Sequence, residues 1–279
     1  MKVFRTIVIT VLAFILSISF TLLTLLCVAE NTLLAPSFAL KTLEKSNYCT
    51  DIHDDLYTEF VSYGYACNIG EDYFDDFFEN SLTEDFIYHD VEKHLVNLYS
   101  NPESEINTDN LSQAIKTTLK QYAVSRGYGS QTSIDEDVDK ISEELSDIYK
   151  GYLSLPAAST ISAMLTRIKS YVPYAFAGLI ALVVVSFILI LVSYKTKKIS
   201  LMYLISSFIA SFLMILAFPM YLRFSNFIGK INIMGKAVYS LVVTYTNSFL
   251  ESVLIYSAIP LVISLFLLII YFAKAKKES

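Results

Sequence analysis

The sequence predicts an all-α protein in which four transmembrane helices accompany an α-helical extracytoplasmic domain, placed between the first and second of them. The main observation is that residues 6–29, 170–194, 199–222 and 252–273 contain no Asp, Glu, Lys or Arg. Each stretch is long enough to cross a hydrocarbon core about 30 Å thick, because a helix rises about 1.5 Å per residue. The second observation is that residues 30–169 show helical periodicity and are strongly acidic.

Basic side chains predict the orientation of these helices. Three segments that would share one side of the membrane are basic: they contain Lys2 and Arg5, then Lys195, Lys197 and Lys198, then Lys274, Lys276 and Lys277. The positive-inside rule places them in the cytoplasm, so we expect a multi-pass protein of the cell membrane with both termini cytoplasmic. The first apolar run exceeds the h-region of a cleaved signal peptide, which favours an uncleaved signal-anchor.

The expected segments follow from these two arguments. They are a cytoplasmic N-terminus (1–5), transmembrane helix 1 (6–29), the extracytoplasmic domain (30–169), transmembrane helix 2 (170–194), a cytoplasmic turn (195–198), transmembrane helix 3 (199–222), an extracytoplasmic loop or helix (223–251), transmembrane helix 4 (252–273) and a cytoplasmic tail (274–279). Ser207 and Ser211 are small and four residues apart, a spacing that permits close contact with another membrane helix.

Cap and breaker residues divide the extracytoplasmic domain into helices. The predicted helices run from Pro36 to Lys45, from Asp51 to Tyr63 with Gly64 as terminator, from Glu71 to Asn80, from the capping box Ser81–Glu84 to Tyr99, from Asp109 to just before Gly127, and from the capping box Ser133–Glu136 to about Gly151. A last helix over 159–169 is expected to continue into the second span through Pro173. Residues 237–250 are expected to form an outer helix that continues into the fourth span, with a kink at Pro260.

Charge indicates which partners the domain attracts. Residues 30–168 carry 25 of the 27 acidic side chains but only 9 of the 21 basic ones. Such a domain repels nucleic acid and attracts cations or basic proteins. Within it, Glu71, Asp75 and Glu79 form one stripe at four-residue spacing, with Asp72 and Asp76 beside them. The stripe is either a solvated helix surface or a face that docks a basic partner, and Arg223, Lys230 and Lys236 of the same chain provide a candidate basic counter-face.

Two cysteines lie in the expected extracytoplasmic domain. Cys49 and Cys67 are separated by 17 residues, and a disulfide between them would stabilise the fold by about 3 kcal/mol in the chain-entropy model. The alternative is a pair of buried free thiols. Cys27 lies inside the first span and is expected to pack there.

The histidines provide weak candidates for a metal site. His89 and His94 are five residues apart, about 140° around a helix, so they lack the spacing of the helical zinc motifs. Asp90 and His94 do share one face, and His53 could join them from elsewhere in the chain. The alternative is that all of these side chains lie on solvated polar surfaces.

Motifs for catalysis are missing from the sequence. It contains no nucleophile elbow, Gly-rich phosphate loop, paired-cysteine zinc site or haem motif. Asp135, Asp137 and Asp139 begin like a calcium loop, but Lys140 and Ser146 stand where that loop needs Gly and Glu, and a helix start explains the same acids. We therefore expect a protein that is not an enzyme and that has no cofactor.

The order of one span, a large outer domain and three further spans resembles the permease subunits of FtsX- and MacB-type ABC systems. The segment at residues 36–48, PSFALKTLEKSNY, is similar to uncharacterised membrane proteins of Gram-positive bacteria that carry a helical outer domain after a signal-anchor. The first resemblance implies an accessory or mechanotransmitting subunit, although residues 195–198 are short for coupling to an ATPase. The second implies no activity.

The leading hypothesis is therefore a non-enzymatic bacterial membrane protein whose outer helical domain binds a protein partner or senses an envelope ligand. The alternatives are an accessory subunit of an ABC-type complex and an extracytoplasmic metal-binding protein.

Overall fold

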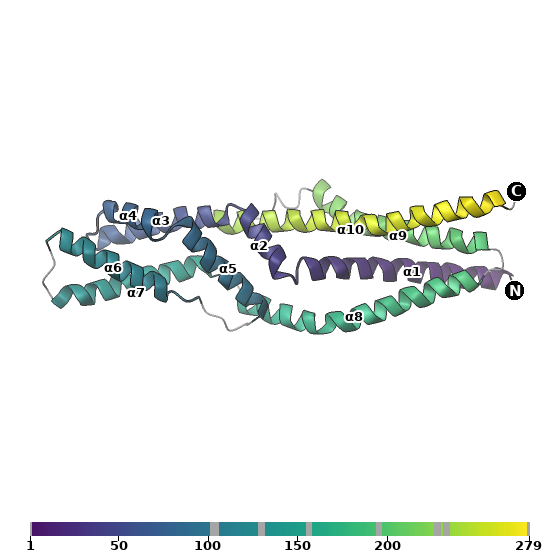
Figure 1. Ribbon diagram of the computed structural model, residues 1–279, viewed down its shortest axis with the longest axis horizontal. Helices are drawn as coiled ribbons and strands as arrows, with labels where there is room; N and C mark the ends of the chain where they lie inside the picture. The colour runs from purple at the N-terminus through teal and green to yellow at the C-terminus, as the bar shows by residue number, and fades with distance from the viewer. Residues whose placement is uncertain are drawn as a thin grey trace. The chain divides into compact units, whose positions relative to one another are not determined.

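The computed structural model describes residues 2–100, 106–127, 132–154, 158–193, 197–225, 230 and 235–277. Ten α-helices and no strand occur in these ranges, which confirms the all-α class. The helices are α1 (Lys2–Asn31), α2 (Pro36–Lys45), α3 (Tyr48–Ala66), α4 (Glu71–Asn80), α5 (Glu84–Ser100), α6 (Asp109–Ser125), α7 (Thr132–Leu153), α8 (Ala158–Ser193), α9 (Lys197–Phe224) and α10 (Lys236–Lys277) (Figure 1).

Four helices, α1, α8, α9 and α10, are long and apolar enough to cross a membrane, as the sequence predicts. Two of them extend well beyond the apolar stretches. Helix α8 runs for 36 residues through Pro173, and α10 runs for 42 residues through Pro260. At about 1.5 Å per residue α10 is about 63 Å long, about twice the thickness of the hydrocarbon core. The predicted continuation of both outer helices into the spans is therefore confirmed.

The chain divides into two compact units. The membrane unit comprises Met1–Phe38, Arg167–Asn232 and Val243–Ser279, and the helical domain comprises Ala39–Thr166 together with Ile233–Val242. The segment Ile233–Val242 lies in what the sequence predicts as an extracytoplasmic loop or helix over 223–251, and the structure groups it with the helical domain. Residues 231–234, which include its start, lie outside the described residues.

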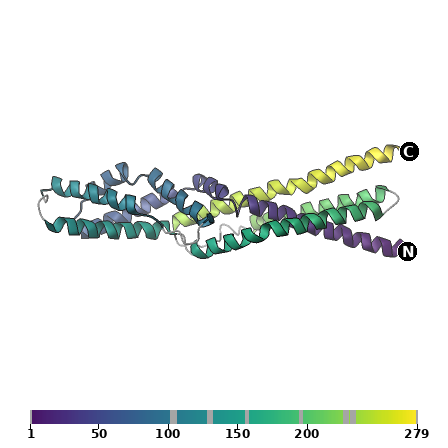
Figure 2. The same cartoon turned by 60° about the horizontal axis from the view of Figure 1, so that its bottom comes forward.

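In the membrane unit, α1 packs along α9. The core between the helices consists of Leu16, Ile190, Leu201, Leu204, Ile205, Phe208 and Leu267. The start of α1, the end of α8, the start of α9 and the end of α10 lie at the same end of this bundle (Figures 1 and 2). The helix ends that carry Arg5, Lys198 and Lys274 therefore lie at one end of the bundle, which is the arrangement that the charge pattern predicts.

Hydroxyl groups join α1 to α9 inside the apolar core. Ser207 Oγ donates to the carbonyl oxygen of Ala13 over 3.0 Å, and the hydroxyls of Thr21 and Ser211 are 2.9 Å apart. Ser207 and Ser211 thus face α1, as their four-residue spacing predicts for a close helix contact.

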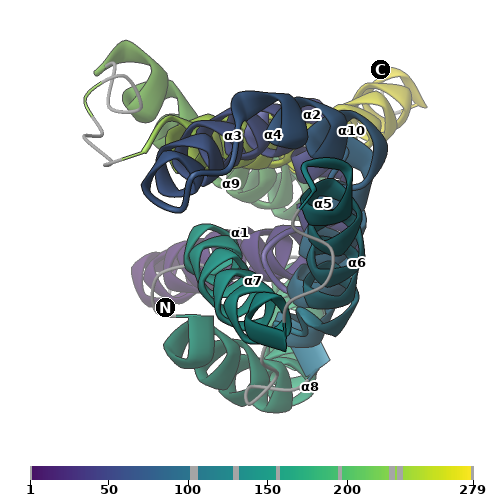
Figure 3. The same cartoon turned by 90° about the vertical axis from the view of Figure 1, so that its left-hand side faces the viewer.

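In the helical domain, α3 contacts α4, α5 and α7, while α6 packs along α7. Helices α3 and α4 lie side by side (Figures 1 and 3). The predicted end of α3 at Gly64 is wrong, because α3 continues to Ala66 and Gly64 is buried inside it. The glycine is needed for packing instead: a Cβ atom at this position would lie 2.6 Å from Phe74 Cζ, on α4.

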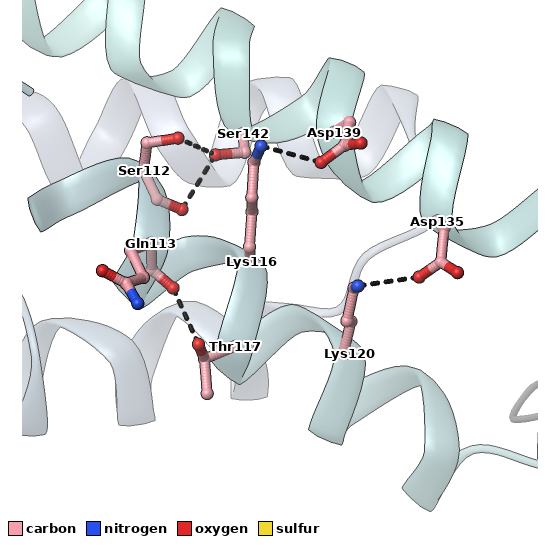
Figure 4. A network of polar contacts seen from close by, with 8 residues as sticks. All are labelled: Ser112, Gln113, Lys116, Thr117, Lys120, Asp135, Asp139 and Ser142. Carbon is pink, nitrogen blue, oxygen red and sulfur yellow. Dashed lines mark hydrogen bonds and ion pairs between the residues drawn. The ribbon is translucent and has the colours of Figure 1, made fainter. Parts of the chain in front are cut away.

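Helices α6 and α7 form an antiparallel pair with polar contacts along its length (Figure 4). Ser112 and Ser142 are hydrogen-bonded at 2.9 Å, and Lys116 and Lys120 each form an ion pair on the next turns of α6. Their partners are Asp139 at 2.8 Å and Asp135 at 2.7 Å. These acids lie inside a helix and pair with lysines, so the interpretation as a helix start rather than a calcium loop is supported.

One of the two predicted capping boxes differs from the structure. Helix α5 begins at Glu84, and Thr83 caps it, because the Phe86 N–H donates to Thr83 Oγ1 over 3.3 Å. Ser81 ends α4 instead, its N–H donating to the carbonyl oxygen of Phe77. The side chain of Ser133, in the second box, lies outside the described residues.

Candidate functional site

Helix α4 presents five carboxylates on one face and aromatic rings on the other. Tyr73, Phe74, Phe77 and Phe78 are buried in the domain core. The opposite surface, called here the α4 acidic face, consists of Glu71, Asp72, Asp75, Asp76 and Glu79, all exposed. The alternation of apolar and acidic residues in the sequence therefore predicts this face correctly, because the buried aromatic side chains fix the direction in which the acids point.

Two tyrosine hydroxyls of α3 hold part of the face in place. Tyr57 of α3 donates to Asp75 over 2.6 Å, and Tyr65 donates to Glu71 over 2.8 Å. These hydrogen bonds to carboxylates raise the pKa of Tyr57 and of Tyr65 above the ordinary value for a phenol. Both phenols therefore stay protonated at neutral pH and orient the acids without neutralising them.

Within the described residues, one cation forms an ion pair with this face. Arg126 at the end of α6 lies 2.7 Å from Asp72, and this contact lowers the pKa of the Asp72 carboxyl. Tyr122 also donates to Asp72 over 3.0 Å, and the Arg126 guanidinium lies 5.1 Å from the centre of the Tyr122 ring. The other four carboxylates lie exposed on the surface.

A cleft of about 560 Å³ adjoins the face and shares Tyr122 and Arg126 with it. The other residues that line it are mostly apolar or small: Cys67, Asn68, Ile69, Gly70, Leu119, Ala123, Ile134, Asp137, Val138 and Ile141. The cleft lies between the turn after α3, the end of α6 and the start of α7. It falls in the size range of pockets that accept small molecules or single side chains of a partner.

Of the three residues of the candidate basic counter-face, Lys236 belongs to the helical domain and forms an ion pair with a residue outside α4. Lys236, at the start of α10, lies 2.8 Å from Asp51 in the first turn of α3. Asp51 is buried, whereas Lys236 is 78% exposed, and their contact raises the pKa of the lysine. A second contact joins the same segments, since the Asn47 N–H donates to Ser240 Oγ over 3.2 Å. Arg223 and Lys230 belong to the membrane unit.

No three of the four metal candidates, all of which lie in the described part of the chain, converge in the structure. His53 packs edge-to-face on Phe78, with ring centres 5.2 Å apart, and His89 Nδ1 lies 3.4 Å from a Glu92 oxygen. Asp90 and His94 line one cavity, as their spacing predicts. Among the described residues, no three His, Cys, Asp or Glu side chains converge in a way that could hold a metal ion.

The proposed disulfide between Cys49 and Cys67 is absent, and both thiols, which lie in the described part of the chain, are free. The physical reason is that α3 runs unbroken from Tyr48 to Ala66. Eighteen residues of helix separate the two cysteines by about 27 Å, far beyond the reach of a disulfide. Burial, with a smaller effect from Glu84, raises the pKa of the Cys49 thiol to about 11, so this thiol is unreactive at neutral pH.

Several residues of the site cannot be found from sequence patterns. Tyr57, Tyr122 and Arg126 contact the acids only through tertiary packing, and the pairing of Asp51 with Lys236 joins positions 185 residues apart. The only sequence signal for these contacts is the strong charge asymmetry of the domain.

Comparison of the chain with protein-family models, with curated proteins and with solved structures finds no match.

Proposed function

We propose that this chain is a non-enzymatic multi-pass protein of the cell membrane whose helical domain binds a basic protein partner on the extracytoplasmic side. The observation that carries the proposal is the α4 acidic face together with the cleft beside it. The face offers negative charge for recognition, and the cleft offers apolar surface for an anchoring side chain.

The charges of the face are costly in the unbound protein. Carboxylates four residues apart on a helix repel each other by about 0.2–0.5 kcal/mol per pair, and three such pairs occur on α4. Elsewhere in the domain the chain supplies cations to its acids, as Lys116 and Lys120 do for α7. The α4 acidic face receives only Arg126 from the described residues. Basic side chains of a partner would relieve this repulsion and speed association by electrostatic attraction.

The cleft supports a protein partner rather than a simple cation. Ile69, Leu119 and Val138 line its apolar part, while Arg126 and Tyr122 stand between it and the acids. Protein interfaces commonly combine an apolar centre with a charged rim. A basic segment with one large apolar residue would occupy both features at once.

Placement of the domain outside the cell rests on the basic helix ends of the membrane unit. It is tested with a single cysteine introduced at Val124, which is 62% exposed, in a variant whose native cysteines are serine. A membrane-impermeant maleimide should label this variant on intact cells. Labelling only after the membrane is permeabilised would place the domain in the cytoplasm and overturn the assignment.

The partner is tested by co-purification of the full-length protein from its native membrane. The test variant combines Glu71→Gln, Asp75→Asn and Glu79→Gln. A matched control neutralises three exposed acids of α7, with Glu136→Gln, Glu143→Gln and Glu144→Gln. We expect a basic protein to be lost from the α4 variant and kept by the α7 control. Equal recovery by both variants would show that the α4 acidic face is not the binding surface.

A further inference from the structure

The membrane unit carries two exposed arginines at the end of the bundle where α8 enters it and α9 leaves it, called here the arginine end. They are Arg167 on α8 and Arg223 on α9, and both belong to the membrane unit. Within the part of the chain that the structure describes, neither of them forms an ion pair, whereas Arg126 of the helical domain pairs with Asp72. Their negative partners therefore have to come from elsewhere.

The two arginines stand at the same height in the bundle. Arg167 lies 26 residues before Ser193, the last residue of α8, and Arg223 lies 26 residues after Lys197, the first residue of α9. Those two helix ends lie together at the opposite end of the bundle (Figures 1 and 2). At about 1.5 Å per residue, each arginine is about 39 Å from that end, which is beyond a hydrocarbon core about 30 Å thick but within the roughly 40–45 Å that include the headgroups. Both arginines therefore stand in the headgroup layer of one leaflet.

Exposed tyrosine rings accompany both arginines. On α8, Arg167, Tyr171 and Tyr174 are four and three residues apart, so they form one stripe along the helix. Tyr174 is 78% exposed, and on α9 Tyr221, two residues before Arg223, is 69% exposed. Tyrosine is enriched where hydrocarbon meets headgroups, because its ring is apolar and its hydroxyl is polar. The rings therefore mark the same level of the bundle as the interface between membrane and water.

The charge of this part of the chain has a single sign. Residues 148–250 contain nine Lys and Arg but no Asp or Glu, so no acid of this stretch offsets the arginines. Bases at the arginine end also oppose the orientation that the basic residues at the other end favour, which is a cost to the chain. An arginine guanidinium binds a phosphate group through two parallel hydrogen bonds, and lipid phosphates are the anions that fill the headgroup layer.

We propose that the arginine end of the membrane unit binds the headgroups of anionic phospholipids. Arg167 and Arg223 donate to lipid phosphates, and the net negative charge of the headgroup makes an anionic lipid preferable to a zwitterionic one. Each basic side chain near a membrane surface should raise the relative affinity for an anionic lipid about fivefold. This binding needs only the membrane unit, so it holds whichever side of the membrane the arginine end faces.

Other occupants fit this surface less well. A second membrane helix would pack on small or apolar residues, whereas the stripe on α8 contains an arginine and two large rings. An acidic protein in solution would have to displace lipid from the headgroup layer to reach the arginines. Zwitterionic phospholipids carry the same phosphate and therefore compete, so the net charge of the headgroup is the property that the experiment varies.

The chain contains no tryptophan, so a single introduced indole reports on the lipids beside it. Full-length protein with Tyr174→Trp is reconstituted in vesicles of brominated phosphatidylcholine, whose bromine atoms quench an indole that they contact. Unbrominated phosphatidylglycerol or phosphatidylcholine is mixed in, and the recovery of fluorescence measures how well each lipid competes for this position. We expect phosphatidylglycerol to bind about fivefold more tightly than phosphatidylcholine, and the preference to decrease at high salt.

Charge variants at the two ends of the bundle assign this preference. In the Tyr174→Trp background, Arg167→Gln should bring the two lipids close to equal affinity, whereas Arg167→Lys, which keeps the charge, should keep most of the preference. Lys274→Gln is the matched control, an exposed base at the opposite end, and it should not change the preference at position 174. With Phe272→Trp as the reporter beside it, the effects of Arg167→Gln and Lys274→Gln should be reversed.

The same measurement with Tyr221→Trp and Arg223→Gln gives an independent test on α9. Three results would overturn the proposal. Equal recovery of fluorescence with both lipids would show that negative charge is not recognised, and an unchanged preference in Arg167→Gln would assign it to another group. An indole at position 174 that brominated lipid does not quench would show that protein, rather than lipid, covers this surface.

Discussion

Substitution of Gly64 tests the packing of α3 against α4 most simply. In the interior of a helix, replacing glycine by alanine normally stabilises by up to about 1 kcal/mol. In this helix the new Cβ would lie 2.6 Å from Phe74 Cζ, closer than real Cβ contacts come. Phe74 is fully buried and its ring lies 5.0 Å from that of Tyr73 and 6.4 Å from that of Phe60, so it has little room to move. Overpacking of this kind costs about 1–3 kcal/mol, which exceeds the gain in helix propensity.

We therefore expect Gly64→Ala to lower the Tm of the full-length protein by several degrees, measured by far-ultraviolet circular dichroism. Gly151→Ala is the matched control, because no atom lies within 4 Å of its added Cβ, and it should keep or raise Tm. In the double variant with Phe74→Leu, the two changes should cost less together than the sum of their separate costs, since the smaller side chain leaves room for the methyl group. Unchanged or raised stability of Gly64→Ala would refute this account of the contact.

Three further predictions concern the other contacts. Lys236→Glu should make the helical domain markedly more sensitive to limited proteolysis, because it places a negative charge beside the buried carboxylate of Asp51. The control variant Lys230→Glu should not have this effect. Equal sensitivity of the two variants would contradict the contact between Lys236 and Asp51. Burial lowers the pKa of His94 from 6.5, so the unfolded chain takes up this proton at a higher pH than the folded chain does. The stability of the protein should therefore decrease as the pH falls below about 6.5. Thermal unfolding recorded across that pH range should show a smaller decrease for His94→Leu. Thr21→Val and Ser211→Ala should each lower the free energy of unfolding of the membrane unit in detergent by about 0.6 kcal/mol. The double variant should lose little more than either single variant. Additive losses would show that the two hydroxyls do not act as a pair.

Local patterns predict those elements whose boundaries are set by local chemistry. The sequence predicts α2 at Pro36–Lys45 and α4 at Glu71–Asn80, and the structure has the same bounds. Proline at the first helical position and the alternation of aromatic and acidic residues both act within a single helix. The four spans are predictable for the same reason, because length and apolar composition suffice.

Features that depend on a distant neighbour are not predictable in this way. Glycine marks both helix ends and close approaches, and only the position of Phe74 shows that Gly64 is of the second kind. The sequence leaves both a disulfide and free thiols open for Cys49 and Cys67, and the structure has free thiols because the full length of α3 separates the two cysteines. The spacing of Asp90 and His94 predicts that they share one face of α5. The cavity that they line exists because Asp109 and its neighbour on α6 form its other side, which local spacing does not predict.

The most direct test of partner binding is photo-crosslinking from the α4 acidic face in native membranes. A photoreactive amino acid replaces Asp76 in one variant and Glu143 on α7 in a matched variant, both exposed positions. We predict an adduct with a basic protein from position 76 that decreases at high salt and is lost when Glu71, Asp75 and Glu79 are neutralised. No adduct from position 76, or the same adducts from both positions, would contradict the central claim.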